Sequence, residues 1–514
     1  MESIVYGRLI ASFFAFLLIN LGIGLYQGRS VRTASTFILG RRLTTSALLL
    51  TLTGTLIGGE YLTNWFRAGS HWGGGSLFLW VIIISVTGLI ATFYIFLRLR
   101  QYKNWHTLGN IAFQKTGSHY AQIAIDGIGL VSSIILLSAQ LVGLKRMTGL
   151  LGFADDHPIA YGIVIFFTVV VIGYASRAGT PGVVSTDVLQ MILVLSGTAF
   201  ITYRVLNLDL AHIRIEGLAD LWHQVKTTAG KNPLRYFLKE DPALIRVLFS
   251  APAAGFILFT PAFIKRVAMA DDNRQLQHSM LGLIMIFSLF MLMILIGGMG
   301  LYVVRGSAVG HNDVYPTLLQ IVPHTWMRMV LLIMFLAAVM STADSVLTAA
   351  SVVAVSVFNS VGIYKEAITA PTLTSLRVAN ITLGFLALGL ALWFMQHPVI
   401  DFVTFARALL GALLPFLLGI SLGIKTSKKA LLGSVVCFGL LFVGSMILGE
   451  LVDFSFLDPR WTNPKFPLRL KYGVFLPFIT LLSCLAYLVL ETVVHGGLKW
   501  EKRVRFTEEK PGLL

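Results

Sequence analysis

The sequence predicts an all-α polytopic membrane protein with about 13 transmembrane helices. Hydrophobic residues make up 56% of the 514 residues, charged residues only 12%, and the mean hydropathy is +0.79. A typical soluble domain carries roughly twice this share of charged residues. Apolar runs long enough to cross a bilayer recur along the whole chain. Composition therefore places the chain among polytopic membrane proteins.

The predicted spans follow the apolar runs in chain order. The first run lacks a basic leading segment and a small-residue cleavage site, so we expect a retained helix instead of a signal peptide. The external segments 207–241, with an amphipathic piece Ile213–Val225, and 450–471 are long enough to hold surface structure. Windows of about 20 apolar residues place the spans at 5–27, 45–70, 76–98, 120–144, 159–175, 185–205, 242–263, 279–304, 327–357, 376–396, 400–423, 430–449 and 472–492.

Basic residues punctuate these spans and predict the orientation of the chain. Lys and Arg number 40 against 24 Asp and Glu, but they form no single patch in the sequence, so we expect no nucleic-acid partner. Cytoplasmic loops carry an excess of Lys and Arg. The most basic loops share one side if the N-terminus is outside and the tail, 499–514, is cytoplasmic. They hold Arg29, Arg32, Arg41, Arg42, Arg98, Arg100, Lys103, Lys265, Arg266, Arg274, Lys425, Lys428 and Lys429.

The sequence contains no pattern typical of an enzyme. Cys437 and Cys484 both lie in apolar runs, so neither a disulfide framework nor a metal cluster is expected. The 11 histidines are scattered, without an HExxH motif. The run His71–Ser76 is rich in glycine but lacks the Lys-Ser/Thr ending of a phosphate loop. We therefore expect a protein without a catalytic site.

The stretch Thr51–Leu62 in the second span is apolar, yet it contains Gly58, Gly59 and Glu60. A glycine pair weakens a helix, and a carboxylate in a membrane requires a partner. Interrupted helices of this kind line binding sites in transporters. The alternative is a glycine pair that packs helices, with Glu60 in a water-filled groove. The seventh span carries a corresponding interruption near Pro261, which suggests an inverted repeat of spans two to six and seven to eleven.

The ninth span holds Ser341, Thr342 and Asp344 within an apolar run. Adjacent hydroxyls, a free carbonyl and a carboxylate suit an alkali cation, which prefers hard oxygen ligands. The alternative is that the hydroxyls bond back to their own helix, while Asp344 faces the cytoplasmic mouth.

Other charges lie inside the predicted spans and are expected to face the bundle interior. Arg407 would pair with Glu60 or with Asp126, and the sequence does not choose between them. Aromatic residues near the interruption would stack on a solute or hold an amine through cation–π contact; the alternative is that they are membrane-interface aromatics. The charges are Arg67, Asp126, Asp187, Arg246 and Arg407, and the aromatic residues are Tyr61, Trp65 and Trp72.

Four stretches together resemble the sodium:solute symporter family. They are Ala34–Arg42, Gly179–Gln190, Lys265–Ala270, which is close to the family's Gln-Arg run, and Ala337–Ser345. Their order and spacing fit the family from about residue 5 to residue 425. The resemblance implies a leucine-transporter-type fold, a five-plus-five inverted repeat with one extra leading helix and two trailing helices. It also implies sodium-coupled uptake by alternating access.

The resemblance also assigns residues to sites. Asp187 would lie on the cation route or at a second sodium site, and Gly58, Glu60 and Thr63 would contact the solute. Tyr61 would join them through its ring, with Phe256 and Pro261 opposite. The sodium ion would be held by the carbonyls of Leu56, Gly59 and Ala338 and the hydroxyls of Ser341 and Thr342.

Glu60 departs from the family, whose members usually have a small or hydroxylic residue there. It favours a cationic or zwitterionic solute. We expect a sodium symporter of a small organic solute, with a proton-coupled carrier using Glu60 or a solute sensor without flux as alternatives. The expected organisation is one transmembrane transporter domain, 1–498, with its core repeat at about 45–423 and a short basic tail at 499–514. The expected location is the plasma membrane, with the lipid bilayer and the solute, but no obligate protein, as partners.

Overall fold

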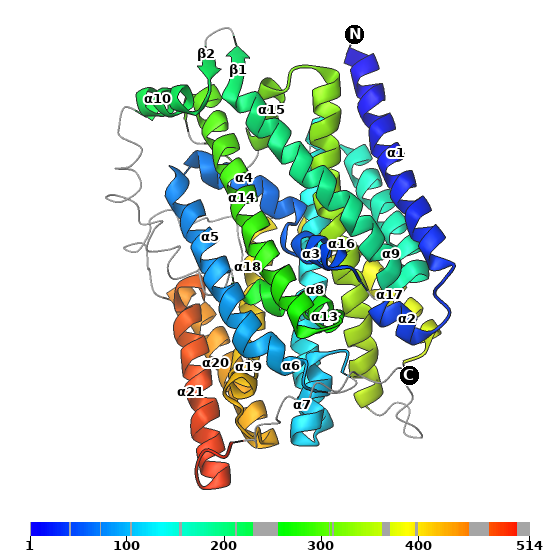
Figure 1. Ribbon diagram of the computed structural model, residues 1–514, viewed down its shortest axis with the longest axis vertical. Helices are drawn as coiled ribbons and strands as arrows, with labels where there is room; N and C mark the ends of the chain where they lie inside the picture. Colours follow the sequence, from blue (N-terminus) through cyan, green and yellow to red (C-terminus); the bar gives the residue numbers. More distant parts are fainter. Residues whose placement is uncertain are drawn as a thin grey trace.

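The computed structural model describes residues 2–40, 43–71, 73–102, 105–153, 157–210, 213–229, 255–307, 309–310, 313–361, 371–395, 399–451 and 472–500. Its helices lie side by side along the long axis of the molecule (Figure 1). Within these residues, 10 helical segments are long and apolar enough to cross a membrane. The chain is therefore a multi-pass membrane protein, as predicted. The number of thirteen spans and the inverted repeat stay predictions.

Long helices make up most of the described chain. The segment after α5 passes through a π-helical stretch, η1 (Ala91–Phe96), into α6 (Leu97–Leu99), and α18 joins α19 through the 3₁₀ turn η5 (Gly411–Leu413). The long elements are α1 (Glu2–Gly28), α5 (Gly73–Ile90), α8 (His119–Met147), α9 (Pro158–Leu206), α14 (Asn273–Arg305), α16 (Thr325–Ser360), α17 (Leu373–Phe394), α18 (Val399–Leu410) with α19 (Leu414–Leu422), α20 (Lys428–Leu451) and α21 (Tyr472–His495).

Shorter elements connect the long helices or cover the ends of the molecule. Two of them, α3 and α4, lie where a single second span was expected. The shorter helices are α2 (Ala34–Leu39), α3 (Thr45–Leu56), α4 (Gly59–His71), α7 (Leu108–Thr116), α10 (Leu218–Ala229), α13 (Pro261–Ala268) and α15 (Val314–Ile321), with 3₁₀ turns η2 (Thr148–Leu151) and η3 (Phe256–Phe259).

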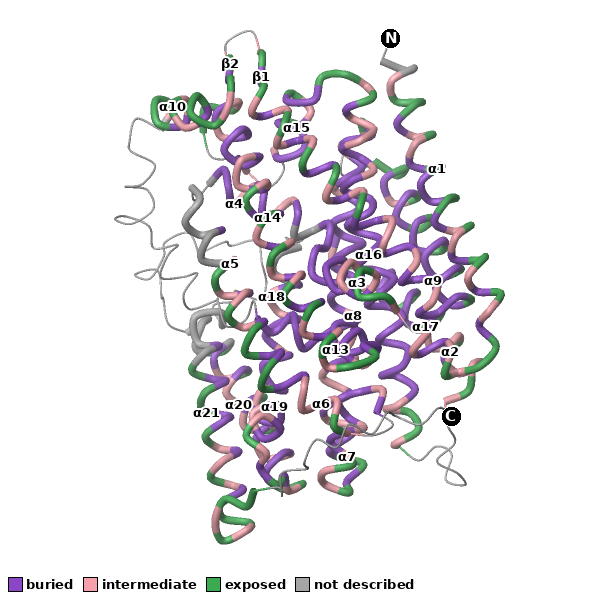
Figure 2. Tube along the Cα trace, in the orientation of Figure 1, coloured by how far each residue is buried: buried purple, intermediate pink, exposed green. Residues whose placement is uncertain are grey.

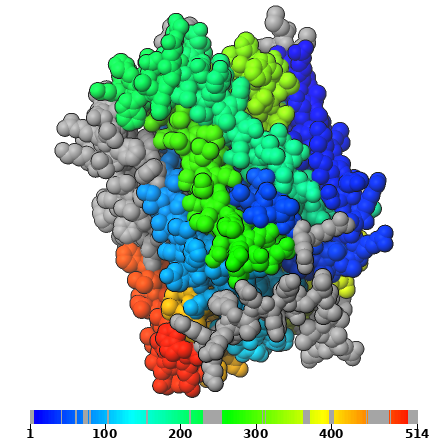
Figure 3. Space-filling view, in the orientation of Figure 1, coloured from blue at the N-terminus to red at the C-terminus, as the bar shows by residue number. Residues whose placement is uncertain are grey.

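A small β-hairpin corrects the all-α prediction. Strands β1 (Asn207–Leu210) and β2 (Ile213–Glu216) pair antiparallel, with Leu208 opposite Ile215. Both of these side chains are buried, so this part of the expected amphipathic piece follows the period-two alternation of a strand. Helix α10 begins only at Leu218. The hairpin and α10 cover one end of the molecule, at the top of Figure 3.

Helix α16 forms the centre of the bundle. Within its most apolar 18-residue window 89% of the residues are buried, against 33% in α1 and α21. It packs against α8, α9, α17, α4, α13, α3 and α1. Figure 2 shows the same contrast, with a buried α16 and an outer face of α1 that is exposed along much of its length. Any polar group on α16 is therefore far from bulk solvent and requires partners inside the protein.

Helix α9 takes the place of two expected spans and bends at Gly179. The backbone of Gly179 has φ 53° and ψ −145°, a conformation open essentially only to glycine. Pro181 follows two residues later and cannot donate a backbone hydrogen bond to the turn before it. A Cβ at Gly179 would also lie 2.8 Å from the carbonyl oxygen of Phe37. The link expected at 176–184 is thus reduced to a kink, where the non-helical backbone of Gly179 joins two helical parts.

Replacing Gly179 with alanine is expected to destabilise the protein by about 2–4 kcal/mol, because backbone strain and the clash with Phe37 add. The melting temperature in detergent measures this loss. Gly173→Ala on the same helix is the matched control, since a Cβ at Gly173 meets nothing within 4 Å. Equal stability of the two variants would contradict the assignment of strain to Gly179.

Candidate functional site

The second span is broken at the glycine pair that the sequence singled out. Helix α3 ends at Leu56, Ile57 leaves the helical region with φ −99° and ψ 87°, and α4 begins at Gly59. The amide of Ile57 still donates to the carbonyl of Thr53, and the amide of Leu62 donates to the carbonyl of Gly58. The last carbonyls of a helix have no partner within it. The break therefore presents carbonyl oxygens inside the protein.

The broken helix lies directly against α16. A Cβ at Gly59 would come within 2.9 Å of the amide nitrogen of Val339, so only glycine permits this approach. A Cβ at Gly54 would collide with Oγ of Ser341. The hydroxyl of Thr342 donates to the carbonyl of Gly54 at 3.4 Å. The ends of α3 and α4 thus face the Ala338–Thr342 turn of α16.

All five residues predicted to hold a cation are buried. Leu56 and Gly59 lie on the broken helix, while Ala338, Ser341 and Thr342 lie on α16. Oγ of Ser341 lies near the carboxylate of Asp187, but it makes no hydrogen bond of good geometry to any described residue. A buried hydroxyl normally finds a partner. Its lone pairs therefore remain available to a ligand.

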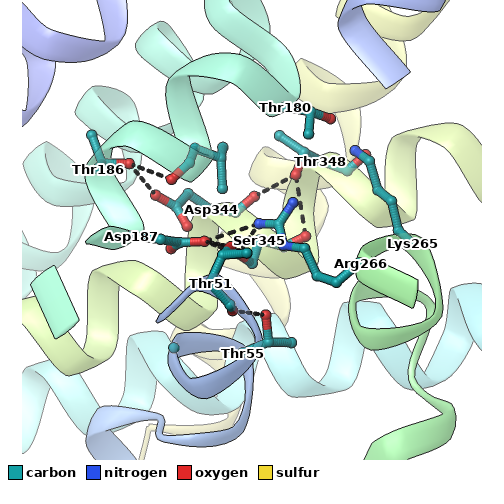
Figure 4. A network of polar contacts seen from close by, with 12 residues as sticks. Thr51, Thr55, Thr180, Thr186, Asp187, Lys265, Arg266, Asp344, Ser345 and Thr348 are labelled. Carbon is teal, nitrogen blue, oxygen red and sulfur yellow. Dashed lines mark hydrogen bonds and ion pairs between the residues drawn. The ribbon is translucent and has the colours of Figure 1, made fainter. Parts of the chain in front are cut away.

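Asp187 of α9 lies at the centre of a buried polar network (Figure 4). Its Oδ2 accepts a hydrogen bond from Thr51 of α3 and another from Ser345 of α16 at 3.2 Å. Nη2 of Arg266, on α13, forms an ion pair with the same oxygen at 3.0 Å and donates to Ser345 at 2.7 Å. One carboxylate therefore connects α3, α9, α13 and α16.

Asp344 of α16 is a second buried carboxylate in this network. Its Oδ2 accepts a hydrogen bond from the hydroxyl of Tyr174 and one from Thr186 at 3.3 Å, both on α9. The alternative in which Asp344 faces a cytoplasmic mouth is wrong, because its side chain is fully buried between α9 and α16. The bend of α9 at Gly179 brings Tyr174 and Thr186 to the same carboxylate.

The network holds more acid than base. Arg266 forms an ion pair with Asp187, whereas Asp344 has no ion pair among the described residues, so one negative charge is in excess when both carboxylates are ionised. Oδ1 of each carboxylate lacks a hydrogen-bond partner within the described part of the chain. Buried charge is retained when it is compensated. The arrangement is suited to a cation or a proton.

The predicted solute residues lie in several places. Thr63 of α4 is half-buried, and its hydroxyl lies 2.8 Å from the hydroxyl of Tyr315 on α15. Trp65 packs edge-on against Phe287 and Phe290 of α14, so α14 covers its ring. Gly58 is buried in the break. The side chains of Glu60 and Tyr61, and all of Trp72 and Arg246, lie outside the described residues.

The seventh span is interrupted just before Pro261. Turn η3 ends at Phe259, Thr260 is extended and caps α13 by accepting from the amide of Phe263, and Pro261 opens the helix. Pro261 lies against Gly129 of α8.

Phe256 is buried beside Gly411, which follows α18. The described contacts of Phe256 and Pro261 join them to these neighbours, and none of these contacts reaches Gly58 or Thr63. The expectation that they line the solute site opposite Gly58 stays a prediction.

Three residues of the network escaped sequence reasoning. Lys265 and Arg266 were expected in a basic loop, but both lie in α13 and are buried, so neither counts toward the orientation of the chain. Tyr174 resembles any other aromatic residue in an apolar run. The signal that was present is Asp187, because an acid inside a span requires a partner.

The suggested pairing of Arg407 with Asp126 is wrong. The oxygens of Asp126 accept from Thr107, Ser356 and the amide of Gly109.

The chain matches known proteins of the kind that its sequence resembles. The sodium:solute symporter family model matches residues 37–437. No curated protein sequence matches the chain. A sodium-coupled sialic acid symporter, in a substrate-bound outward-open state with a novel sodium site, is similar in structure, with a TM-score of 0.73, 15% identity and coverage of 96% of this chain and 99% of that chain.

Two more distant structures share the fold. MhsT in complex with L-phenylalanine has a TM-score of 0.52 and 14% identity, covering 86% of this chain and 98% of its own. Mhp1, a nucleobase-cation-symport-1 family transporter with bound bromovinylhydantoin, has a TM-score of 0.54 and 13% identity, covering 89% and 95%.

Arg266→Gln is expected to lower the free energy of unfolding by about 3–5 kcal/mol, because it leaves the buried Asp187 unpaired. Thermal unfolding in detergent measures the change. Arg214→Ala removes the exposed pair with Glu216 and serves as the control, with an expected loss of less than about 1 kcal/mol. Adding Asp187→Asn to Arg266→Gln is expected to recover part of the stability, and a double variant no more stable than the single one would contradict the pairing.

Proposed function

We propose that this chain, which belongs to the sodium:solute symporter family, takes up a small cationic or zwitterionic organic solute together with sodium. Family and structural neighbours are transporters and not enzymes, and they support sodium-coupled symport. One observation carries the proposal for this chain. It is the contact between the broken helix and α16, where Ser341 has an unpartnered hydroxyl.

In this proposal the sodium ion binds where α3, α4 and α16 meet. The carbonyls of Leu56, Gly59 and Ala338 and the hydroxyls of Ser341 and Thr342 are its five ligands. Sodium is a hard cation and takes oxygen ligands, and carbonyls freed by a helix break are suited to replace its hydration shell. The burial of all five residues and the free lone pairs of Ser341 support this assignment.

Asp187 lies beyond the five proposed sodium ligands and acts on the route of the cation. Arg266 already holds its Oδ2, while Oδ1 has no partner among the described groups. The carboxylate thus stabilises a passing cation without being its only counter-charge. Thr51, which donates to Asp187, lies on α3 one turn before Gly54 and links this route to the broken helix.

The charge of the solute follows from the position of Glu60. In interrupted helices the N-terminal end of a half-helix carries partial positive charge and attracts anionic groups of the substrate. Glu60 is the second residue of α4, so this chain supplies its own carboxylate at that end. A solute carrying an amine or a quaternary ammonium group is therefore favoured over a purely anionic one.

Transport proceeds by alternating access. Tyr315 of α15 contacts Thr63 of α4, and α15 lies at the same end of the molecule as the N-terminus (Figure 1). In the proposed orientation this end is outside, the tail 499–514 is cytoplasmic and the protein lies in the plasma membrane. Helix α15 then covers the solute site from the outside.

Ser341→Ala and Thr342→Ala are each expected to weaken the apparent sodium affinity of uptake by about tenfold or more, because each removes a ligand worth about 1.4 kcal/mol. Sodium-dependent uptake into proteoliposomes measures the effect. Ser288→Ala on α14 is the control, since its hydroxyl bonds back to the carbonyl of Ile284. Uptake that is indifferent to sodium in the unmodified protein would rule out sodium coupling.

Glu60→Gln tests the role of the carboxylate. If it selects a positively charged solute, the variant loses uptake of amine-bearing solutes by about tenfold or more while its sodium dependence persists. The solute is first identified by thermal-shift screening of amines, amino acids and organic acids, with and without sodium. Loss of pH dependence with unchanged solute preference would instead favour proton coupling through Glu60.

A further inference from the structure

We propose that a cavity between α7, α8, α13 and α16 is a binding site for a small monovalent anion, held by the ammonium group of Lys265. The cavity is small, with a volume of about 20 Å³, and its wall includes His106, Thr107, Asp126, Pro261, Lys265 and Ala349. No residue from Leu56 to Gly59, and none of the proposed ligands on α16, lines it. It is therefore separate from the proposed sodium site.

Lys265 is a buried amine with few partners, and burial and then the charge of Arg266 lower its pKa well below the usual value. Its side chain is 3% exposed, and its Nζ donates one long hydrogen bond, 3.4 Å, to the carbonyl of Thr348. Within the described part of the chain no carboxylate lies within 4 Å of it. The next residue, Arg266, points to Asp187 and Ser345 instead (Figure 4). A buried ammonium group is costly unless it is paired.

A neutral ring nitrogen and two helix ends complete the polar wall of the cavity. Nδ1 of His106 is buried and has no hydrogen-bond partner among the described residues. Burial and then the charge of Lys265 lower the pKa of His106 below its usual value. The wall also includes Thr107 and Pro261, at the first turns of α7 and α13, where helix dipoles place partial positive charge.

Asp126 is the opposing charge, but its oxygens are already held. They accept from the hydroxyl of Thr107 at 2.9 Å, from the amide of Gly109 at 2.9 Å and from the hydroxyl of Ser356 at 2.6 Å. Three donors stabilise this carboxylate where it lies, at the first turn of α7. Because these donors hold Asp126 in place, the unused donor positions of Lys265 are open to a mobile anion.

The ligand is a small inorganic anion or the carboxylate of a small solute, since both offer one negative charge in a compact volume. Purified full-length protein in sodium-free detergent solution tests both. Its melting temperature is measured in chloride, nitrate, formate and acetate against gluconate at constant ionic strength. A saturable rise of about 1–2 °C is expected with at least one of the first four anions.

Substitutions test whether the anion-dependent rise in melting temperature comes from binding in the cavity. Lys265→Gln is expected to abolish the rise and Lys265→Arg to retain it. Ala349→Leu, which narrows the cavity and keeps the ammonium group, is expected to reduce it. Lys145→Gln is the matched control, because Lys145 is also buried, at 5% exposed, but lies 4.6 Å from the ring centre of Tyr161 and does not line the cavity. It is expected to keep the rise.

The changes in melting temperature distinguish an inorganic anion from a carboxylate, and either of them from the absence of an anion site. A rise with chloride or nitrate identifies an inorganic anion site, and a rise only with formate or acetate identifies a carboxylate site. A rise that persists in Lys265→Gln, or no rise with any anion, overturns the proposal; in the second case Lys265 balances Asp126 through water. A sodium-dependent shift measured separately in Lys265→Gln reports the cation site, so failure of the anion site and failure of sodium binding are distinguishable.

Discussion

The close packing of a broken helix against α16 is the constraint on which the centre of this protein depends. Gly59 permits it, because any larger side chain would meet the backbone of Val339. The approach buries carbonyl oxygens that a continuous helix would satisfy internally. Such oxygens are costly inside a membrane protein unless they have a ligand. The break therefore creates both a local instability and the polar surface that a cation would relieve.

Around this contact the fold concentrates charge that a membrane protein normally avoids. Asp187, Asp344 and Arg266 are buried together, and they come from α9, α16 and α13. The bend of α9 at Gly179 contributes to this arrangement, because it lets Tyr174 and Thr186 of the same helix both reach Asp344. Because every member has a partner on another helix, a movement of any one helix changes the electrostatic balance of the others.

Helix α16 also lies between the two proposed ion sites. Its Ala338–Ser345 segment faces the carbonyls of the broken helix and the carboxylates, whereas Ala349, Val352 and Val353 border the cavity that holds Lys265. Less than two helical turns lie between Asp344 and Ala349. The proposed sodium and anion sites would therefore share one rigid wall, and occupancy of either would bear on the position of the same helix.

Much of the fold and part of the candidate site could be predicted from the sequence. Hydropathy identified the membrane class and most spans, because the apolar length that crosses a bilayer is fixed. Gly58–Gly59 indicated the break, because a glycine pair weakens a helix. Asp187 indicated a buried partner, because a charge inside a span is costly unless it is paired. A family resemblance then tied Ser341 and Thr342 to the same region.

The tertiary structure alone decided which groups meet. Lys265 and Arg266 look like loop residues in the sequence, and only the turn at Thr260 brings them into the bundle. Arg407 and Asp126 were plausible partners by charge, yet donors on α7 and α16 hold Asp126. Hydropathy and spacing act along the chain, whereas a buried charge chooses among all groups that folding brings within a few ångströms. The sequence by itself determined a membrane bundle with a broken helix, and packing determined the pairing of its buried charges.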